Sequence, residues 1–187
     1  MKRLIELAKK IKDKDLREKT LDVLKNFEIK NKHFKKYKKI PLDKAFGGPT
    51  QFHHDYEGGL VEHTYSVTLL CLQMADVFEK VYGLEVNRDH LIAGALLHDI
   101  MKMYWYKKEG NLVVSTDAMI DHGIWACCEL YLRDFPEEVI HIIASHFGPQ
   151  GPNPPQTIEA IILFYADSLD ANIDMHRRKK EFEVLFL

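Results

Sequence analysis

Hydrophobic residues recur at helical spacing along most of this chain of 187 residues. Near the start, Leu4, Leu7 and Ile11 fall three or four positions apart, which puts them on one face of a helix. Between residues 103 and 116, aromatic and β-branched runs instead flank a Lys-Glu-Gly-Asn turn, which predicts a β-hairpin. The expected helices cover residues 2–12, 15–28, 32–39, 60–82, 87–102, 118–133, 136–146 and 157–176. The pattern therefore predicts an all-α helical bundle with one small hairpin.

The predicted helix over 87–102 ends in two adjacent polar residues. His98 and Asp99 follow the apolar stretch Ala93-Gly-Ala-Leu-Leu. Burying an imidazole and a carboxylate together is costly unless a partner neutralises both, and a divalent metal ion does so by binding both as ligands. For this pair alone, a hydrogen-bonded core histidine beside a helix-ending aspartate is the simpler interpretation. Further His and Asp residues in similar settings favour the metal ion.

Six candidate metal ligands are spread over the chain. They are His63, His98, Asp99, His122, His146 and Asp167. Apart from the adjacent pair, each comes from a different predicted helix or helix end, so that several helices can converge on one point. Imidazole and carboxylate donors without cysteine favour a catalytic site for Fe²⁺, Mn²⁺, Mg²⁺ or Zn²⁺ over structural zinc. Six donors exceed the need of one catalytic ion with open positions, so we expect one or two ions.

The composition is that of a globular protein, with 46% hydrophobic and 29% charged residues, and the length fits a single domain over residues 1–187. No apolar run is long enough to span a membrane, and Met1-Lys-Arg begins a charged helix rather than a signal peptide. The three cysteines, two of them adjacent, fit no disulfide framework, which favours a reducing cytoplasm.

The net charge of −2 conceals an uneven distribution. Residues 1–40 hold 15 of the 26 Lys and Arg but 6 of the 28 Asp and Glu, which makes this segment +9 and the remainder −11. A basic segment of this kind can bind nucleic acid. No aromatic stacking platform accompanies the lysines, however, and we favour solvated helix faces of a thermophile-like protein. These N-terminal helices are expected to pack on or beside a metal-binding core over residues 50–175.

The ordered set His63, His98-Asp99 and Asp167 resembles the H…HD…D signature of the HD-domain metal-dependent phosphohydrolases. The resemblance covers residues 50–175, and its local motifs are Glu57-Gly-Gly-Leu-Val-Glu-His63-Thr, Gly94-Ala-Leu-Leu-His98-Asp99 and Tyr165-Ala-Asp167-Ser-Leu-Asp170-Ala. His122 and His146 match the extra histidines of members with two metal ions. A single ion, with these two histidines binding phosphate instead, is the alternative. The glycine that usually follows the doublet is replaced here by Ile100.

The resemblance implies an HD-type helical bundle that hydrolyses a phosphoester with a metal-activated water molecule. Asp99 would bridge the ions and help to hold that water, and Asp170 would orient a ligand histidine. Lys102 and His146 would contact the substrate phosphate. His54, in a loop rich in titratable groups, would contact the substrate and protonate the leaving alkoxide.

The chain resembles two groups of this family. In size, single HD domain and Lys-rich composition it resembles the archaeal dihydroneopterin 2′,3′-cyclic phosphate phosphodiesterases of methanopterin biosynthesis, which are implied to be Fe²⁺-dependent. In the strings around His63 and Asp167 it resembles the HD domain of a bacterial 3′-to-5′ exoribonuclease, whose upstream OB-fold this chain lacks. We favour a cyclic phosphodiesterase acting on a small pterin or nucleotide ester. An exoribonuclease-like nuclease and a non-catalytic nucleotide-sensing module are the alternatives, and a homo-oligomer is compatible with the sequence.

Overall fold

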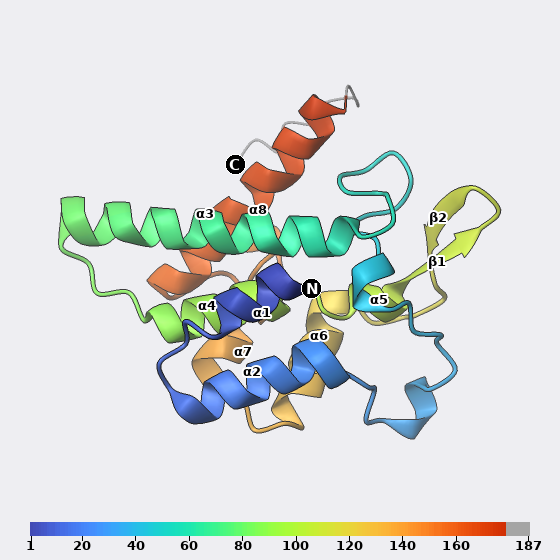
Figure 1. Ribbon diagram of the computed structural model, residues 1–187, viewed down its shortest axis with the longest axis horizontal. Coiled ribbons are helices and arrows are strands. Elements are labelled where there is room, and N and C mark those ends of the chain that lie inside the picture. Colours follow the sequence, from blue (N-terminus) through green and yellow to red (C-terminus); the bar gives the residue numbers. More distant parts are fainter. Residues whose placement is uncertain (179–187) are drawn as a thin grey trace.

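The computed structural model describes residues 1–178, which form a bundle of helices with one two-stranded hairpin at its side (Figure 1). The predicted all-α architecture with a small hairpin is confirmed. Residues 179–187 belong to the expected domain over 1–187 but lie outside the described residues. The elements are α1 (Lys2–Ala8), α2 (Lys14–Asn26), η1 (Lys32–Phe34), η2 (Leu42–Lys44), α3 (Gly59–Tyr82), α4 (Arg88–Leu97), α5 (Lys102–Trp105), β1 (Tyr106–Glu109), β2 (Leu112–Ser115), α6 (His122–Tyr131), α7 (Glu137–Ala144), η3 (Gly148–Gln150) and α8 (Ile158–Arg177).

Helix α4 is at the centre of the bundle, where it packs against α1, α2, α3, α7 and α8. Every residue from Leu91 to Leu97 is buried, which explains why this stretch is apolar on all sides. Gly94 lets α7 approach closely, because a Cβ at this position would lie 2.5 Å from Cγ2 of Ile142. The position of α4 carries the two polar residues that follow it into the interior of the protein.

The N-terminal helices share the core of the bundle. Leu4, Leu7 and Ile11 are buried in the same apolar cluster as Leu96 of α4 and Trp125 of α6. Most lysines of residues 1–40 lie on the outward, exposed faces of this segment. The basic charge of the segment is therefore carried on a surface whose inner side is anchored by hydrophobic packing.

The structure corrects two predicted helices. The helix expected over 87–102 ends at Leu97, and a turn precedes the short helix α5. In this turn the amide of Lys102 donates to the carbonyl of Asp99 at 2.9 Å. Hydrophobic spacing did not reveal the break, because the turn residues Ile100 and Met101 are as buried as the helix before them. The basic helix expected over 32–39 is only the 3₁₀ turn Lys32–Phe34.

The predicted hairpin is present, but it begins at Tyr106, because the residues before it belong to α5. The strands are antiparallel, with Tyr106 opposite Ser115 and Glu109 opposite Leu112. Gly110 takes the left-handed conformation (φ 59°) that the tight turn needs. In the part of the chain that the structure describes, we find no helix with the length and apolar character needed to cross a membrane.

Candidate metal centre

The six sequence-predicted ligands lie together inside the bundle, although they come from five segments. His63 lies on α3, His98 and Asp99 in the turn after α4, His122 at the start of α6, His146 just after α7 and Asp167 on α8. Five of the six are buried, and Asp167 is half-buried. They form two groups of donors, each with its ligand atoms within 4.8 Å of one another.

The first group consists of His63, His98 and Asp167. Nε2 of His63 lies 3.3 Å from Nε2 of His98 and 3.1 Å from Oδ1 of Asp167. Two donors that each lie about 2.1 Å from one ion are about 3.0–3.4 Å apart in octahedral or tetrahedral geometry. The spacing of the His63 pairs therefore matches that of donors around a single ion. Nε2 of His98 and Oδ1 of Asp167 are slightly further apart, at 3.8 Å.

The second group consists of Asp99, His122 and His146, and Asp99 also faces the first group. Its Oδ1 lies 3.1 Å from Nε2 of His122, whereas its Oδ2 lies 3.2 Å from Nε2 of His63 and 2.6 Å from Nζ of Lys102. With Nε2 of His122 deprotonated, the buried Oδ1 has no hydrogen-bond donor, which is costly unless a cation takes its place. The residues therefore fit one metal ion in each group, with Asp99 between them.

The Nδ1 atoms of the four histidines face fixed partners. Nδ1 of His98 donates to the carbonyl of Ala95 at 2.8 Å, and Nδ1 of His146 to the carbonyl of Ile143 at 2.6 Å. Nδ1 of His63 lies 2.7 Å from Oδ2 of Asp170, and Nδ1 of His122 lies 3.3 Å from Oδ2 of Asp121. Partners of this kind fix the Nδ1–H tautomer, so that Nε2 keeps its lone pair for a metal ion.

The electrostatics of the centre keep its carboxylates ionised. Burial raises the pKa of Asp167, but the hydrogen bond from His63 and the charge of His98 outweigh it and hold the pKa below its ordinary value. Burial likewise raises the pKa of Asp99, whereas Lys102 and His98 lower it further than burial raises it. The centre therefore presents anionic oxygens, which are the form that binds a cation.

Lys102 is buried beside Asp99. Its Nζ lies 2.6 Å from Oδ2 of Asp99 and donates to the carbonyl of Gly47 at 2.7 Å. The sequence led us to expect this ammonium group at the substrate phosphate. In the structure it pairs with a candidate metal ligand and joins the loop around Gly47 to the centre, and its contact with a phosphate stays a prediction.

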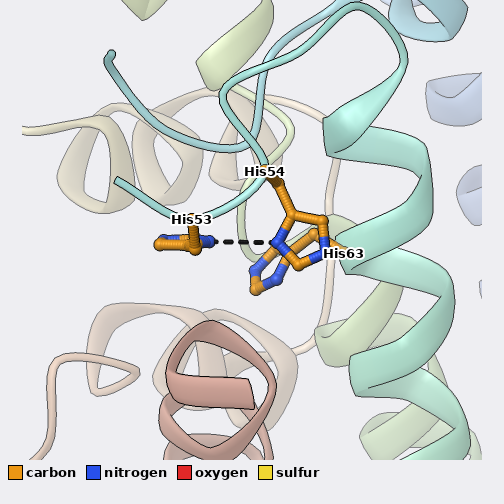
Figure 2. Close-up of side chains that lie close together, drawn as sticks. All are labelled: His53, His54 and His63. Carbon is orange, nitrogen blue, oxygen red and sulfur yellow. Dashed lines mark hydrogen bonds between the residues drawn. The ribbon is translucent and has the colours of Figure 1, made fainter. Parts of the chain in front are cut away.

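The two loop histidines lie beside His63, with ring centroids 5.0 Å (His53) and 5.2 Å (His54) from that of His63 (Figure 2). His54 is buried, with its Nε2 3.6 Å from Oδ2 of Asp170. Its backbone has a positive φ of 50°, which is uncommon for a residue with a side chain. His53 is only half-buried, and its Nδ1 lies 3.3 Å from Nδ1 of His54. Of the two, His53 is the imidazole nearer to solvent, although the sequence pointed to His54.

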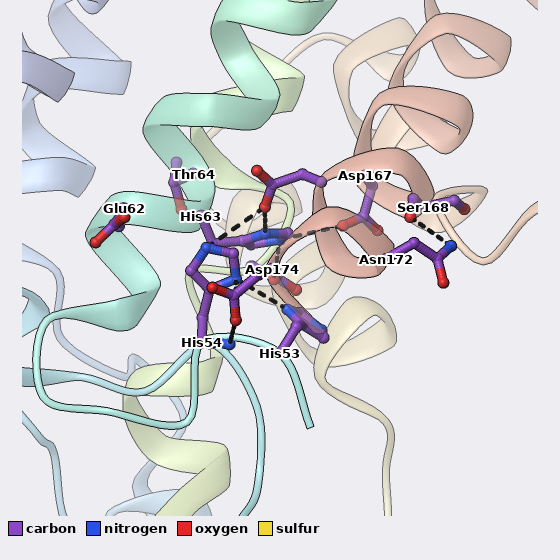
Figure 3. Close-up of polar contacts among 12 residues, drawn as sticks. His53, His54, Glu62, His63, Thr64, Asp167, Ser168, Asn172 and Asp174 are labelled. Carbon is purple, nitrogen blue, oxygen red and sulfur yellow. Dashed lines mark hydrogen bonds and ion pairs between the residues drawn. The ribbon is translucent and has the colours of Figure 1, made fainter. Parts of the chain in front are cut away.

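Asp174 and Asp121 support the centre and were not among the predicted site residues. Oδ2 of Asp174 accepts a hydrogen bond from the backbone amide of His54 at 2.7 Å, which joins α8 to the loop (Figure 3). Asp174 lies one helical turn after Asp170, so the helical spacing of the α8 aspartates was the signal available for it. Asp121 caps α6 by accepting from the amide of Gly123 at 2.7 Å, a role typical of an Asp before a helix.

The bundle and its buried cluster of imidazoles and carboxylates define the class of this protein, a helical metal-dependent hydrolase. The family model of the HD domain matches residues 60–172, a range that contains all six candidate ligands. The chain belongs to the HD domain family.

Similar proteins of known function indicate which bond a hydrolase of this class cleaves. The dihydroneopterin 2′,3′-cyclic phosphate phosphodiesterase of Methanocaldococcus jannaschii is 50% identical over 93% of this chain and 70% of that protein. The 3′-5′ exoribonucleases YhaM of Bacillus licheniformis and Bacillus subtilis are 35% and 32% identical over 83% of this chain. The chain spans 54% of the length of each exoribonuclease. No solved structure gives a significant match. The family match and these relatives together show that the chain is a metal-dependent phosphohydrolase.

Proposed function

We propose that this chain is a phosphodiesterase that opens a 2′,3′-cyclic phosphate, with a dihydroneopterin ester as its substrate. The observation that carries the proposal is Asp99, whose two buried oxygens face His63 and His122, which belong to two separate groups of candidate ligands. The identity of 50% with a cyclic phosphate phosphodiesterase supports the substrate.

One ion would be held by His63, His98, Asp99 and Asp167, and a second by Asp99, His122 and His146. When bound, such ions lower the pKa of a water molecule and polarise the phosphoryl oxygens. We propose Fe²⁺ because the resemblance to the archaeal cyclic phosphodiesterases implies it, and Mn²⁺, Mg²⁺ or Zn²⁺ suit the same imidazole and carboxylate donors. The three cysteines are unpaired thiols, which supports a cytoplasmic location.

The residues of the chain would supply positioning and proton transfer. Water attacks phosphorus, the bond between phosphorus and one ring oxygen breaks, and the departing alkoxide takes up a proton to give a phosphomonoester. The candidate donors of this proton are His54 and the adjacent His53, which is the less buried of the two, whereas Nε2 of His54 lies 3.6 Å from Oδ2 of Asp170. Lys102 would offset the negative charge of Asp99 through its 2.6 Å contact.

The test is hydrolysis by protein purified without oxygen, after its metal content has been measured. We expect up to two ions per chain and faster cleavage of dihydroneopterin 2′,3′-cyclic phosphate than of the linear diester bis(p-nitrophenyl) phosphate. Asp99→Asn should lower the rate by about 10³-fold, because metal ions contribute several kcal/mol of transition-state stabilisation. Asp22→Asn, an equal change of charge on the exposed side of α2, serves as the control. Full activity of Asp99→Asn would contradict the proposal.

A second function, degradation of RNA from its 3′ end, is favoured by the exoribonuclease relatives and by the basic residues 1–40. Binding of single-stranded RNA would then weaken steeply with salt, because each neutralised phosphate releases counterions. Degradation of a 3′-labelled oligoribonucleotide without cleavage of the cyclic ester would select this function over the first.

A further inference from the structure

A groove of about 880 Å³ runs beside the candidate metal centre, between α6, the loop after α7 and α8. This volume is in the range of small-molecule sites in proteins. The large apolar side chains that line it are unusually exposed for their type. They are Ile124 (46%), Phe147 (41%), Tyr165 (42%) and Leu169 (48%). Grouped exposure of this kind marks a surface that binds something apolar.

The groove is continuous with the metal centre through Phe147. The centroid of its ring lies 4.1 Å from that of His146 and 5.3 Å from that of His122, so the phenyl ring borders two candidate ligands. On α8, the groove-lining Ser168 directly follows Asp167. A phosphate held at the metal ions would therefore leave the organic part of its ester at the opening of the groove.

The wall of the groove is preformed. Gly148 takes a positive φ of 72°, and a Cβ at this position would lie 2.3 Å from the ring of Phe164. The loop therefore sits directly on Phe164, which also lines the groove. The amide of Gly148 donates to the carbonyl of Ser145 at 2.9 Å, which fixes the turn after Phe147. A preformed wall spares a ligand the entropic cost of ordering it.

Polar groups occur at one side of the groove. Nδ2 of Asn172 donates to the carbonyl of Ser168 at 2.8 Å, as Figure 3 shows. This hydrogen bond fixes the orientation of the amide and leaves its Oδ1 as an acceptor. An apolar slot with an aromatic ring at one end and an amide acceptor at its side suits a flat ring that carries N–H donors.

We propose that this groove binds the planar heterocycle of the phosphoester substrate, with the ring against Phe147 and an N–H group of the ring donating to Asn172. The inference rests on the proposed function for the position of the phosphate. It assigns the preference for a ring-bearing ester to residues that are not metal ligands.

Binding and hydrolysis are measured separately. Neopterin, which lacks a phosphate, is titrated against the metal-loaded protein by its own fluorescence. Hydrolysis of the ring-bearing cyclic phosphate is compared with that of propane-1,2-diol cyclic phosphate, which has no ring. The variants are Phe147→Ala, Ile124→Trp, which fills the groove from α6, and Asn172→Leu. Tyr131→Ala, a change at a 71% exposed aromatic residue of α6 outside the groove, is the matched control.

We expect wild type and Tyr131→Ala to bind neopterin and to prefer the ring-bearing ester equally. Phe147→Ala should weaken binding and reduce this preference by about 10-fold through KM, as loss of an aromatic contact predicts. Ile124→Trp should do the same by obstructing the groove, and Asn172→Leu by removing the amide acceptor. Ile124→Trp tests the groove without touching His146, and the metal content of every variant is measured alongside.

The two proposals fail in different ways. If wild type hydrolyses both cyclic esters equally and does not bind neopterin, the groove assignment is overturned while the proposed function stands. If wild type binds neopterin in a manner sensitive to the groove variants but hydrolyses no cyclic ester, the proposed function fails and the groove assignment stands. Absence of both binding and hydrolysis overturns both.

Discussion

Replacing Asp170 by Asn tests how the metal centre is held in place. Oδ2 of Asp170 lies 2.7 Å from Nδ1 of His63 in a buried setting, and the Nε2 atom of the same ring faces His98, Asp99 and Asp167. The substitution keeps the size and shape of the side chain but removes its charge. The hydrogen bond to His63 then loses its ionised acceptor, and Nε2 becomes a weaker ligand.

The expected effect follows from this one contact. Loss of a partner that orients a metal-binding histidine typically costs 10- to 100-fold in metal affinity, or about 1.4–2.7 kcal/mol. Because an ion that binds only the folded protein stabilises it by its binding free energy, the same amount is lost from the metal-dependent stability. For a chain of this size, 1 kcal/mol corresponds to about 2–4 °C in Tm. The Tm of metal-loaded Asp170→Asn should therefore lie roughly 3–11 °C below that of wild type.

The assay is competition for the metal ion against a chelator of known affinity, together with Tm measured with and without metal. Asp174→Asn is the matched control, since it makes the same change of charge one helical turn further on but contacts the backbone amide of His54 rather than a predicted ligand. Its metal affinity should stay within about threefold of wild type, well below the effect expected for a partner of a ligand. Equal metal affinity of Asp170→Asn and wild type, or equal losses in both variants, would refute the orienting role of Asp170.

Three further changes give distinct signatures. Asp99→Asn should reduce bound metal as well as activity, because both groups of donors lose their shared carboxylate; elemental analysis that still finds two ions per chain would rule out the bridging arrangement. Gly123→Ala would place a Cβ 2.6 Å from Cε1 of His146, so we expect elemental analysis to find about one ion fewer per chain; the control is Cys128→Ala, a change at an exposed residue of the same helix. Burial raises the pKa of Asp174, but its hydrogen bonds lower it below 3.8, so the ionised form stabilises the fold at neutral pH and this stabilisation is lost as the pH falls through the lowered pKa. Thermal unfolding of Asp174→Asn should accordingly give a lower Tm than wild type at pH 7 and the same Tm in strong acid; a constant difference at all pH values would contradict this linkage.

Much of the fold was predictable because its signals are local. The long helices α3 and α8 follow from hydrophobic spacing, and the hairpin from its turn residues. The break after Leu97 was not predictable in this way. Ile100 and Met101 in the turn are as buried and apolar as the helix before them, and only the tight hydrogen bonds of the turn end α4. Periodicity reports burial, and here burial continues where the helix does not.

The candidate site likewise combines features that the sequence shows locally and features that depend on tertiary packing. The types of donor can be read from the sequence, and several imidazoles and carboxylates in similar buried settings favour a cation, which a single His-Asp pair does not. The sequence by itself therefore determined a helical bundle with six candidate metal-binding side chains. It also indicated that Asp170 would support a ligand, because the spacing of three residues places it on the same face of α8 as Asp167.

Only the tertiary structure decided which of these groups meet. His63 and Asp170 are 107 residues apart, and His54 and the carboxylate of Asp174 are 120 apart. Whether such pairs touch depends on how α3, α8 and the loop before α3 pack. The same packing turned Lys102 toward Asp99, enclosed His54 and left His53 nearer to solvent. It also opened the groove beside Phe147, whose lining comes from three separate segments. Residue chemistry is local and can be read along the chain, whereas distances between remote residues are set by the packing of the whole bundle.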